Sequence, residues 1–325
     1  MHAMTTDEAQ NIAREVVRIV FGQTPTKALF RVGRGAVNHV YGIQVGDRTL
    51  IVRFAGHEGA AEEHQKEAWC IRKASEAGVP GPEVLALGTV SGNSYMIQTY
   101  LEGIAGEEAP SRWPQVWHEL GRYARLSHSI SVQGFGGQLT DAERGLFSNS
   151  HTPTWEAYIH YNIASLAVDD ALVELGVYST RQRVEIASLF ASLHTDTFQF
   201  GLCHNDLKPG NTIMGTSGKV ALLDWGSAMV HIVPHMDLAE ILRWQDPNAH
   251  NVRSFLEGYA LSWTEFKAML PQVEALQLIG AFDLVRWAIA RRPDRLVECA
   301  ARAKRLLERT LYGTPWEADQ ESVQP

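Results

Sequence analysis

The segment from residue 202 to 226 constrains the fold of this chain more than any other part of the sequence. It holds three short apolar runs, which predict strands and lie before His204, at 212–214 and at 220–223. Glycine, threonine and serine at 215–218 supply the turn of a hairpin between the last two runs. The segment therefore predicts a strand, a loop and a β-hairpin in close succession.

Three polar residues stand where these predicted strands end. Asp206 follows the first strand, Asn211 comes five residues later, and Asp224 comes thirteen residues after Asn211. Phosphoryl transfer needs one carboxylate to orient and deprotonate a hydroxyl, and oxygen ligands for magnesium on the nucleotide phosphates. A His-x-Asp pair or an Asp-x-Gly turn is common by itself. Their combination, with an amide at the matching offset and a hairpin between, favours the order of a kinase catalytic loop.

Size and composition predict a globular protein. The chain of 325 residues has room for two lobes, and 45% hydrophobic with 20% charged residues is typical of a sizeable core. No apolar run reaches the ~18 residues that cross a membrane, and the start lacks the pattern of a secretory signal. Cys70, Cys203 and Cys299 offer neither a disulfide framework nor zinc-ligand spacing. We expect a cytoplasmic protein without a membrane partner.

Charge is unevenly distributed along the chain. Residues 1–102 carry 10 Lys and Arg against 11 Asp and Glu, whereas 103–325 carry 19 against 26, so most of the net charge of −8 lies in the second part. Such acidity disfavours nucleic acid and would attract a cationic ligand. Ordinary solubility accounts for it equally well.

The first hundred residues predict a helix and then a strand-rich section. Thr5 and Glu8 form the pattern of a capping box before the helix. Strands are expected at 28–32, 40–45, 49–54, 84–88 and 94–100, and a second helix at 60–77. The glycine-rich residues 33–39 can bring backbone N–H groups close to phosphate oxygens, because glycine has no Cβ. A plain hairpin turn is the alternative, and no Walker A lysine follows.

Arg53 interrupts an apolar strand pattern and so needs a partner or a cleft. Glu67, Ile71 and Ala74 recur at helical spacing on one face of the next predicted helix, so Glu67 can point inward with the apolar stripe. We therefore predict an Arg53–Glu67 pair. The alternative places Glu67 at the surface, beside Lys66 and its acidic neighbours.

Small, flexible residues at 101–106 predict a lobe boundary. We expect an N-terminal nucleotide-binding lobe over 1–101, a C-terminal catalytic and substrate lobe over 102–312, and a disordered tail over 313–325. The larger lobe is predicted to be mainly helical, with a long loop at 131–154 that is rich in glycine, serine, threonine and proline. Its helices are expected at 113–124, 155–166, 182–193, 237–244, 252–261, 271–290 and 295–311.

Taken in order, these features resemble the aminoglycoside phosphotransferase and choline kinase family, small-molecule relatives of the protein kinases. The resemblance covers about residues 28–245 and implies an α+β, two-lobed, protein-kinase-like fold, with a small antiparallel-sheet lobe and a larger, mainly helical lobe. Residues 134–136 and 155–158 also look like the hygromycin B phosphotransferase branch. The residues that carry the family resemblance are 33–41, Arg53, Glu67, 95–103, 204–211 and 224–226.

The resemblance implies roles for the residues of the catalytic segment. Asp206 would be the base that positions the acceptor hydroxyl, with His204 and Lys208 as further catalytic residues. Asn211 and Asp224 would hold Mg²⁺ against the nucleotide phosphates.

The nucleotide, ATP or GTP, would be held by residues of the N-terminal lobe. Arg53, paired with Glu67, would contact the α- and β-phosphates; many kinases have lysine here, but the fork of arginine also suits phosphate oxygens. The adenine would bind the Thr99 carbonyl and the Leu101 N–H. The remaining contacts would come from the glycine-rich loop, through Gly33, Gly35 and Asn38.

The catalytic segment also resembles protein kinases, because Lys208 stands where they carry a lysine near the transferred phosphate. However, no Ala-Pro-Glu-like anchor and no activation segment follow Asp224. Residues 233–237 instead lead directly into a predicted helix, as in the antibiotic and choline kinases. This favours a small-molecule acceptor.

The sequence thus predicts ATP- and Mg²⁺-dependent phosphorylation of a hydroxyl on a small, cationic molecule. An aminoglycoside-type antibiotic is the first candidate, which would give antibiotic resistance. The alternatives are an endogenous amino alcohol, sugar or sugar-amine, then a protein substrate, and last an inactive nucleotide-binding module. We expect a monomer or weak dimer with no nucleic-acid partner. Acidic residues that could face the substrate are Asp169, Asp170, Asp237 and Glu240.

Overall fold

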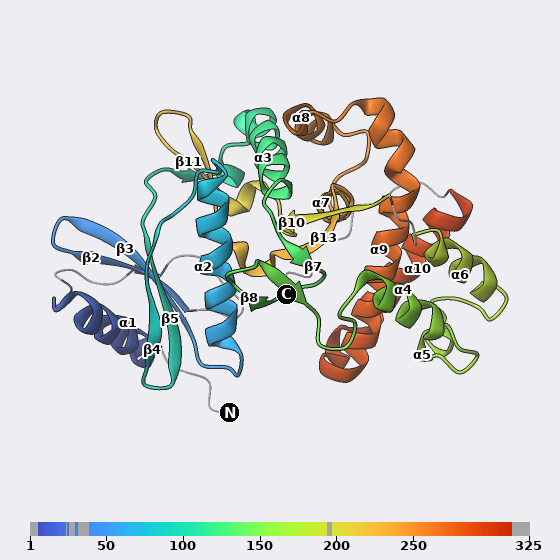
Figure 1. Cartoon of the computed structure of the whole chain (residues 1–325), viewed down its shortest axis with the longest axis horizontal. Helices are drawn as coiled ribbons and strands as arrows, with labels where there is room; N and C mark the ends of the chain where they lie inside the picture. Colours follow the sequence, from blue (N-terminus) through green and yellow to red (C-terminus); the bar gives the residue numbers. More distant parts are fainter. Residues whose placement is uncertain (1–5, 24, 26–29, 32–38, 194–196, 314–325) are drawn as a thin grey trace. The chain divides into compact units, whose positions relative to one another are not determined.

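The chain forms two units that are each compact in their internal contacts. Unit 1 contains residues up to 110 together with 209–228, and unit 2 contains 111–208 and the chain from 229 onward. The fold is taken from a computed structural model (Figure 1). It describes residues 6–23, 25, 30–31, 39–193 and 197–313.

Unit 1 is built on a five-stranded antiparallel sheet with the strand order β1-β2-β3-β5-β4. The strands predicted at 40–45, 49–54, 84–88 and 94–100 are confirmed, each with its ends shifted by at most two residues. Their bounds are β1 Phe30–Arg31, β2 His39–Val45, β3 Arg48–Ala55, β4 Val84–Val90 and β5 Asn93–Thr99.

A helix covers each face of this sheet (Figure 1). Leu50, Val52 and Phe54 of β3 are buried in one core together with Ala9, Ala13, Val16 and Val17 of α1 (Thr6–Phe21). Because side chains alternate along a strand, Arg53 points to the other face, where it meets α2 (Ala60–Glu76). The predicted capping residue Thr5 lies outside the described residues.

The predicted hairpin is confirmed, and it lies in unit 1. β11 (Thr212–Met214) pairs with β12 (Val220–Leu222), and β11 also pairs with β6 (Ile104–Ala105) on its other side. These pairings explain why 209–228 belongs to unit 1 by contacts, whereas the predicted lobe boundary at 101/102 places it in the larger lobe.

Two helices of unit 2 approach each other closely, α3 (Trp113–His128) and α8 (His250–Tyr259). A Cβ on Gly121 would lie 2.0 Å from the Phe255 carbonyl oxygen, and one on Gly258 would lie 1.8 Å from the His118 carbonyl oxygen. Since neither carbonyl can move without bending its helix, only glycine fits at these two positions.

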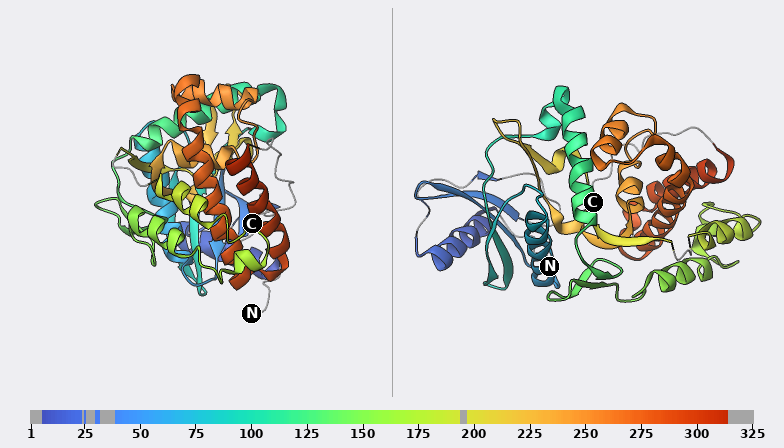
Figure 2. Two further views of the ribbon diagram at one scale, coloured as in Figure 1. Left: turned by 90° about the vertical axis from the view of Figure 1, so that its right-hand side faces the viewer. Right: turned by 45° about the horizontal axis from the view of Figure 1, so that its top comes forward.

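The longest helix of unit 2 begins earlier than predicted. α9 spans Trp263–Arg291 and starts with a capping box between Ser262 and Glu265, so the predicted start at Pro271 is wrong. Pro271 lies inside the helix. α9 and α10 (Leu296–Tyr312) run side by side in both views of Figure 2. The other helices are α4 Trp155–Ala164, α5 Ala171–Glu174, α6 Arg183–Ala191 and α7 His235–Ile241.

The long loop predicted at 131–154 is also wrong, because this segment folds into a small sheet. Its strands are β7 Gln133–Gly134, β8 Gln138–Asp141 and β9 Leu146–Ser148, in the order β7-β9-β8. Phe135 and Phe147 are buried and give the segment an apolar anchor. The mixed α+β composition is confirmed. Among the helices in the described part of the chain, none has the length and apolar character to cross a membrane.

Candidate active site

Asp224 lies just beyond the hairpin of unit 1, on a backbone that is held from the upstream side. It has a φ of 59°, which is unusual for a residue other than glycine. Before it, the Leu222 N–H donates to the Pro80 carbonyl at 2.8 Å and the Leu223 N–H to the Asn211 carbonyl at 2.9 Å. The Asp224 side chain is 52% exposed. Its carboxylate is therefore presented to solvent from an anchored turn.

Arg53 and Glu67 form the predicted pair. Arg53 Nη1 donates to Glu67 Oε1, and Arg53 Nη2 lies 3.5 Å from Asp224 Oδ1. The side chains of Arg53 and Glu67 are only 11% and 3% exposed. Burial alone disfavours the charged guanidinium, but Glu67 and Asp224 outweigh it and raise the pKa of Arg53. The contact is confirmed, and it extends to a third charge that the sequence did not indicate.

The other predicted nucleotide-binding residues also belong to unit 1. Thr99 is the last residue of β5. Its N–H donates to the Glu83 carbonyl, and its hydroxyl oxygen accepts the N–H of Glu83, both at 2.9 Å. Leu101 follows two residues later, before β6. The predicted contacts of Gly33, Gly35 and Asn38 lie outside the described residues.

The loop that carries Asp206 lies in unit 2, directly after β10 (Gln199–Cys203). Its backbone turns at Asn205, where φ is 62°. The Asn205 N–H donates to Asp237 Oδ1 at 2.7 Å, and the His204 N–H donates to Asp237 Oδ2 at 3.3 Å. Asp237 is fully buried on α7. It binds the backbone of this loop, so the prediction that it could face the substrate is wrong.

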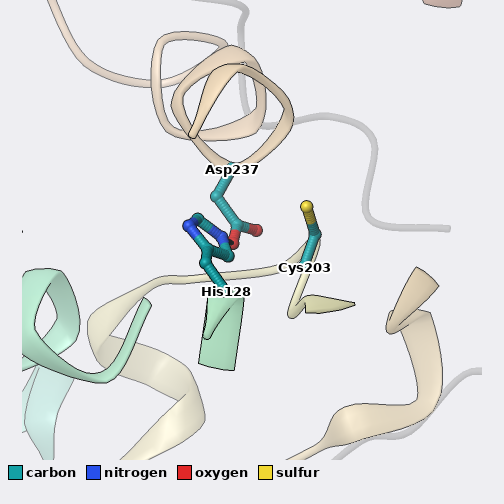
Figure 3. Close-up of side chains that lie close together, drawn as sticks. All are labelled: His128, Cys203 and Asp237. Atoms are coloured by element: carbon teal, nitrogen blue, oxygen red, sulfur yellow. Dashed lines mark hydrogen bonds and ion pairs between the residues drawn. The ribbon is translucent and has the colours of Figure 1, made fainter. Parts of the chain in front are cut away.

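His128, at the end of α3, also meets the Asp237 carboxylate (Figure 3). Its Nε2–H donates to Asp237 Oδ2 at 2.8 Å, and its Nδ1 is hydrogen-bonded to the hydroxyl of Tyr259 at 2.9 Å. Burial alone raises the pKa of the Asp237 carboxyl, but His128 and the Asn205 N–H outweigh it and hold the pKa below its ordinary value. Asp237 thus stays ionised and holds the loop; we call Asp237, His128 and Tyr259 the loop brace.

Cys203 lies beside the loop brace, and its sulfur is within 4.8 Å of ligand atoms of His128 and Asp237. Burial raises the pKa of the Cys203 thiol well above its usual range, so the thiol stays protonated and is a poor metal ligand. Both oxygens of Asp237 already accept hydrogen bonds. The chemistry of this group therefore suits a support for the loop better than a metal centre.

Asp206 and Lys208 form an ion pair at the accessible side of the loop. Lys208 Nζ lies 3.0 Å from Asp206 Oδ2, and the two side chains are 38% and 34% exposed. His204, by contrast, is fully buried, and its backbone N–H is bound to the loop brace. The loop thus combines a fixed backbone with one accessible carboxylate that has a cation beside it.

This geometry, a hairpin that ends in Asp224 and a loop that presents Asp206, agrees with the result of a comparison with protein families. A model of the phosphotransferase enzyme family matches residues 30–276 of the chain. The chain belongs to this family. No curated protein matches the phosphotransferase.

Solved structures of aminoglycoside phosphotransferases share the fold of this phosphotransferase. APH(4)-Ia, in a ternary complex with AMP-PNP and hygromycin B, has a TM-score of 0.65 at 17% identity, over 93% of this chain and 99% of that one. The GDP complex of aminoglycoside 2'-phosphotransferase-IIIa has a TM-score of 0.66 at 15% identity, over 91% and 98%. Spectinomycin phosphotransferase APH(9)-Ia has a TM-score of 0.55 at 14% identity, over 93% and 94%. These likenesses confirm the predicted protein-kinase-like fold.

Unit 1 of the phosphotransferase provides oxygen donors of the kind that suit Mg²⁺. Asn211 and Asp224 offer an amide and a carboxylate, which are hard ligands of the kind that Mg²⁺ prefers. Their backbones are joined by the hydrogen bond from Leu223 to Asn211, which ties the two residues to one turn. The donor set and this link fit the predicted metal role.

Sequence reasoning missed three residues that support these two segments: Lys66 in unit 1, and His128 and Tyr259 in unit 2. Lys66 bonds main-chain carbonyls, and His128 bonds both Asp237 and Tyr259, so no simple spacing of charges in the sequence indicates them. Among the acidic residues predicted to face the substrate, Asp170 caps α5 and binds Tyr178 and Arg286. Asp169 is exposed.

Proposed function

We propose that this phosphotransferase moves the terminal phosphoryl group of a nucleoside triphosphate to a hydroxyl of a small molecule. The observation that carries this proposal is the loop in unit 2: an accessible Asp206 carboxylate on a backbone that Asp237 holds through two N–H groups. A catalytic base needs this combination, because it must reach the acceptor hydroxyl and keep a defined direction.

Asp206 orients the acceptor hydroxyl and takes its proton as the new O–P bond forms. The bond between the terminal phosphorus and the bridging oxygen breaks in the same transfer, and the nucleoside diphosphate leaves. Lys208, with its Nζ 3.0 Å from the Asp206 carboxylate, supplies positive charge near the negatively charged oxygens of the transferred phosphoryl group. His204 acts through its backbone N–H, which donates to Asp237 and so fixes the loop. In this proposal His204 is a positioning residue.

The nucleotide side of the reaction belongs to residues of unit 1. Arg53, oriented by Glu67, contacts the phosphates of ATP or GTP, and the backbone of Thr99 and Leu101 binds the base. Asn211 and Asp224 hold Mg²⁺, which when bound neutralises negative charge on the phosphates. The support for these roles is the buried Arg53–Glu67 pair and its approach to Asp224.

An aminoglycoside-type antibiotic is the proposed acceptor. Support comes from the fold, which the chain shares with APH(4)-Ia in complex with hygromycin B and with the spectinomycin phosphotransferase. The excess of 26 acidic over 19 basic residues in 103–325 also favours a cationic acceptor. An amino alcohol, sugar or sugar-amine of the cell is the competing acceptor class.

A substrate panel tests this function. The purified protein is incubated with Mg²⁺, with ATP or GTP, and with aminoglycosides or endogenous amino alcohols and sugars, and mass spectrometry looks for the gain of one phosphate. We expect phosphorylation of at least one aminoglycoside, and protection of a sensitive bacterium that expresses the protein. The Asp206→Asn variant is the matched control and should give no product. Phosphorylation of a metabolite without any aminoglycoside product would reject the antibiotic acceptor.

A further inference from the structure

Lys66 is a buried lysine next to the Arg53–Glu67 pair, and none of the roles proposed above for the reaction involves it. It precedes Glu67 on α2 and is 9% exposed. Its Nζ donates to the carbonyl of Gly226 at 2.6 Å and to the carbonyl of Ala228 at 3.1 Å. Both carbonyls belong to unit 1, in the turn that follows Asp224.

Burial of a lysine is unfavourable unless its ammonium gains specific bonds. Desolvation accordingly lowers the pKa of Lys66. Lys73, about two turns farther along the same helix, shows the ordinary arrangement, with its Nζ 2.7 Å from Glu76 and its side chain 36% exposed. The contrast indicates that Lys66 serves to bind the turn that follows Asp224, whereas Lys73 is an ordinary surface lysine.

Lys66 closes a set of bonds around Asp224. Upstream of Asp224, the N–H groups of Leu222 and Leu223 are held by the carbonyls of Pro80 and Asn211. Downstream of Asp224, Lys66 donates to the carbonyls of Gly226 and Ala228. Both of these hydrogen bonds would be lost if Lys66 were absent. Asp224 itself adopts the left-handed conformation, which a residue other than glycine leaves easily unless both sides of the turn are fixed.

We propose that Lys66 is a positioning residue for Asp224. It holds the backbone after Asp224 against α2, so that the carboxylate is presented in a defined direction to a divalent cation. α2 thereby acts on the nucleotide side through two successive residues, Glu67 on the Arg53 guanidinium and Lys66 on the main chain. This inference rests on the proposed function of Asp224.

Two measurements on Lys66→Met test the proposal, since methionine keeps most of the side-chain volume and removes the ammonium. The first is hydrogen exchange of amides 225–229 in the free protein, among them the Ala228 N–H that bonds the Trp225 carbonyl. The second is the magnesium dependence of binding of a fluorescent ATP analogue without acceptor. We expect about tenfold faster exchange and about a tenfold higher magnesium requirement, the effect of losing two modest hydrogen bonds.

Two further variants serve as controls. Lys73→Met changes an exposed lysine of the same helix and should match wild type in both measurements. Lys66→Arg keeps a cationic donor and should restore most of the magnesium response. If Lys66→Met does not fold, Lys66→Gln, which keeps one shorter donor, is measured in its place and should show the same two changes, each less than about tenfold.

The outcomes separate this inference from the proposed function. Unchanged exchange, or faster exchange with an unchanged magnesium requirement, would overturn the positioning role while the function stands. A wild-type protein that binds no nucleotide in the presence of magnesium would overturn the function and the positioning role together. Faster exchange with a raised magnesium requirement, reversed by Lys66→Arg, supports the proposal.

Discussion

In unit 1 the backbone around Asp224 is held by a cation, whereas in unit 2 the backbone before Asp206 is held by an anion. Lys66 donates to the carbonyls of Gly226 and Ala228, and Asp237 accepts from the N–H groups of His204 and Asn205. Each segment contains one left-handed residue that is not glycine, Asp224 with φ 59° and Asn205 with φ 62°.

The difference follows from which main-chain groups each turn directs inward. A turn takes its residues out of sheet pairing, so their polar groups need other partners when they are buried. Inward carbonyls need a donor, such as the cationic side chain of lysine or arginine, and inward N–H groups need an acceptor such as a carboxylate. The two units therefore use opposite charges for the same task, and removing either charge should loosen the backbone beside Asp224 or Asp206.

The largest expected effect separates the two carboxylates by function. Asp206→Ala should lower turnover by about 10³-fold or more, because it removes the proposed base, and should leave nucleotide binding unchanged. Asp224→Ala should instead weaken magnesium-dependent nucleotide binding. Steady-state kinetics together with nucleotide titrations at several magnesium concentrations measure both.

The comparison would break if the two variants behaved alike. Equal losses of nucleotide binding in Asp206→Ala and Asp224→Ala would mean that the carboxylates do not divide into an acceptor side and a nucleotide side. Asp294→Ala, at an exposed position of unit 2, is the control and should leave both measurements at wild-type values.

Features that depend on side-chain pattern could be predicted from the sequence. The hairpin, the strands of the main sheet and the Arg53–Glu67 pair were predicted, because apolar alternation and a charge inside an apolar strand are visible in the residues themselves. The start of α9 was not predicted, because proline is common at a first helical position and so favours a start at Pro271, although Ser262 and Glu265 form a capping box upstream.

Supports that act on the main chain could not be predicted in this way. Lys66 was considered only as a surface neighbour of Glu67, and Asp237 as a residue that could face the substrate. Every residue carries a main-chain carbonyl, and every residue except proline also carries an N–H, so the sequence holds no signal for which of these groups meets a given side chain. These contacts depend on backbone conformation at Asn205 and Asp224, which the chain adopts only after folding.

The next largest effect is on stability, from the anion in unit 2. Asp237→Ala removes the acceptor of two backbone N–H groups and of His128, and buried donors without partners are costly. We expect a loss of about 3–5 kcal/mol in the free energy of unfolding. Urea denaturation measures it, with Asp294→Ala, which breaks an exposed pair with Arg292, as the control. A loss no larger than that of the control would show that Asp237 does not hold the loop.

A smaller effect is expected from the charges of unit 1. Glu67→Gln leaves the Arg53 guanidinium buried, but Asp224 still lies 3.5 Å from it, so the loss of stability should be only about 2 kcal/mol. The double variant Arg53→Met/Glu67→Leu should recover much of this loss, because no buried charge is left unpaired, while nucleotide binding stays weak. Both are followed by urea denaturation and by nucleotide titration. If Glu67→Gln were less stable than Asp237→Ala, the charges of unit 1 would contribute more to the free energy of unfolding than the anion of unit 2, contrary to this prediction.

The smallest effect concerns acid, which protonates buried histidines whose pKa is lowered in the folded protein: His64 in unit 1, and His231 and His235 in unit 2. Burial, as the largest cause, lowers the pKa of His64 to about 4 and that of His231 to about 3. Both rings are neutral in the folded protein, and His231 Nδ1 accepts the N–H of Ile232 at 2.9 Å. In the unfolded chain each takes up a proton near its ordinary pKa of about 6.5. Stability is therefore complete above this pH and declines as the pH falls toward the folded values.

The expected decline is at most about 1.4 kcal/mol per pH unit for each ring. Denaturation between pH 8 and pH 4, in roughly half-unit steps, should show a shallower slope for His64→Gln and for His231→Asn, which keep polar groups but do not titrate in this range. Hydrogen exchange in β5, where Ser94 binds His64, and in β13 (Met229–Val233), which contains His231, assigns the loss to a unit. If β13 weakens first on acidification, the more strongly shifted histidine makes unit 2 the acid-sensitive half. If the two strands weaken together, or the variants keep the wild-type slope, the two histidines do not account for the acid response.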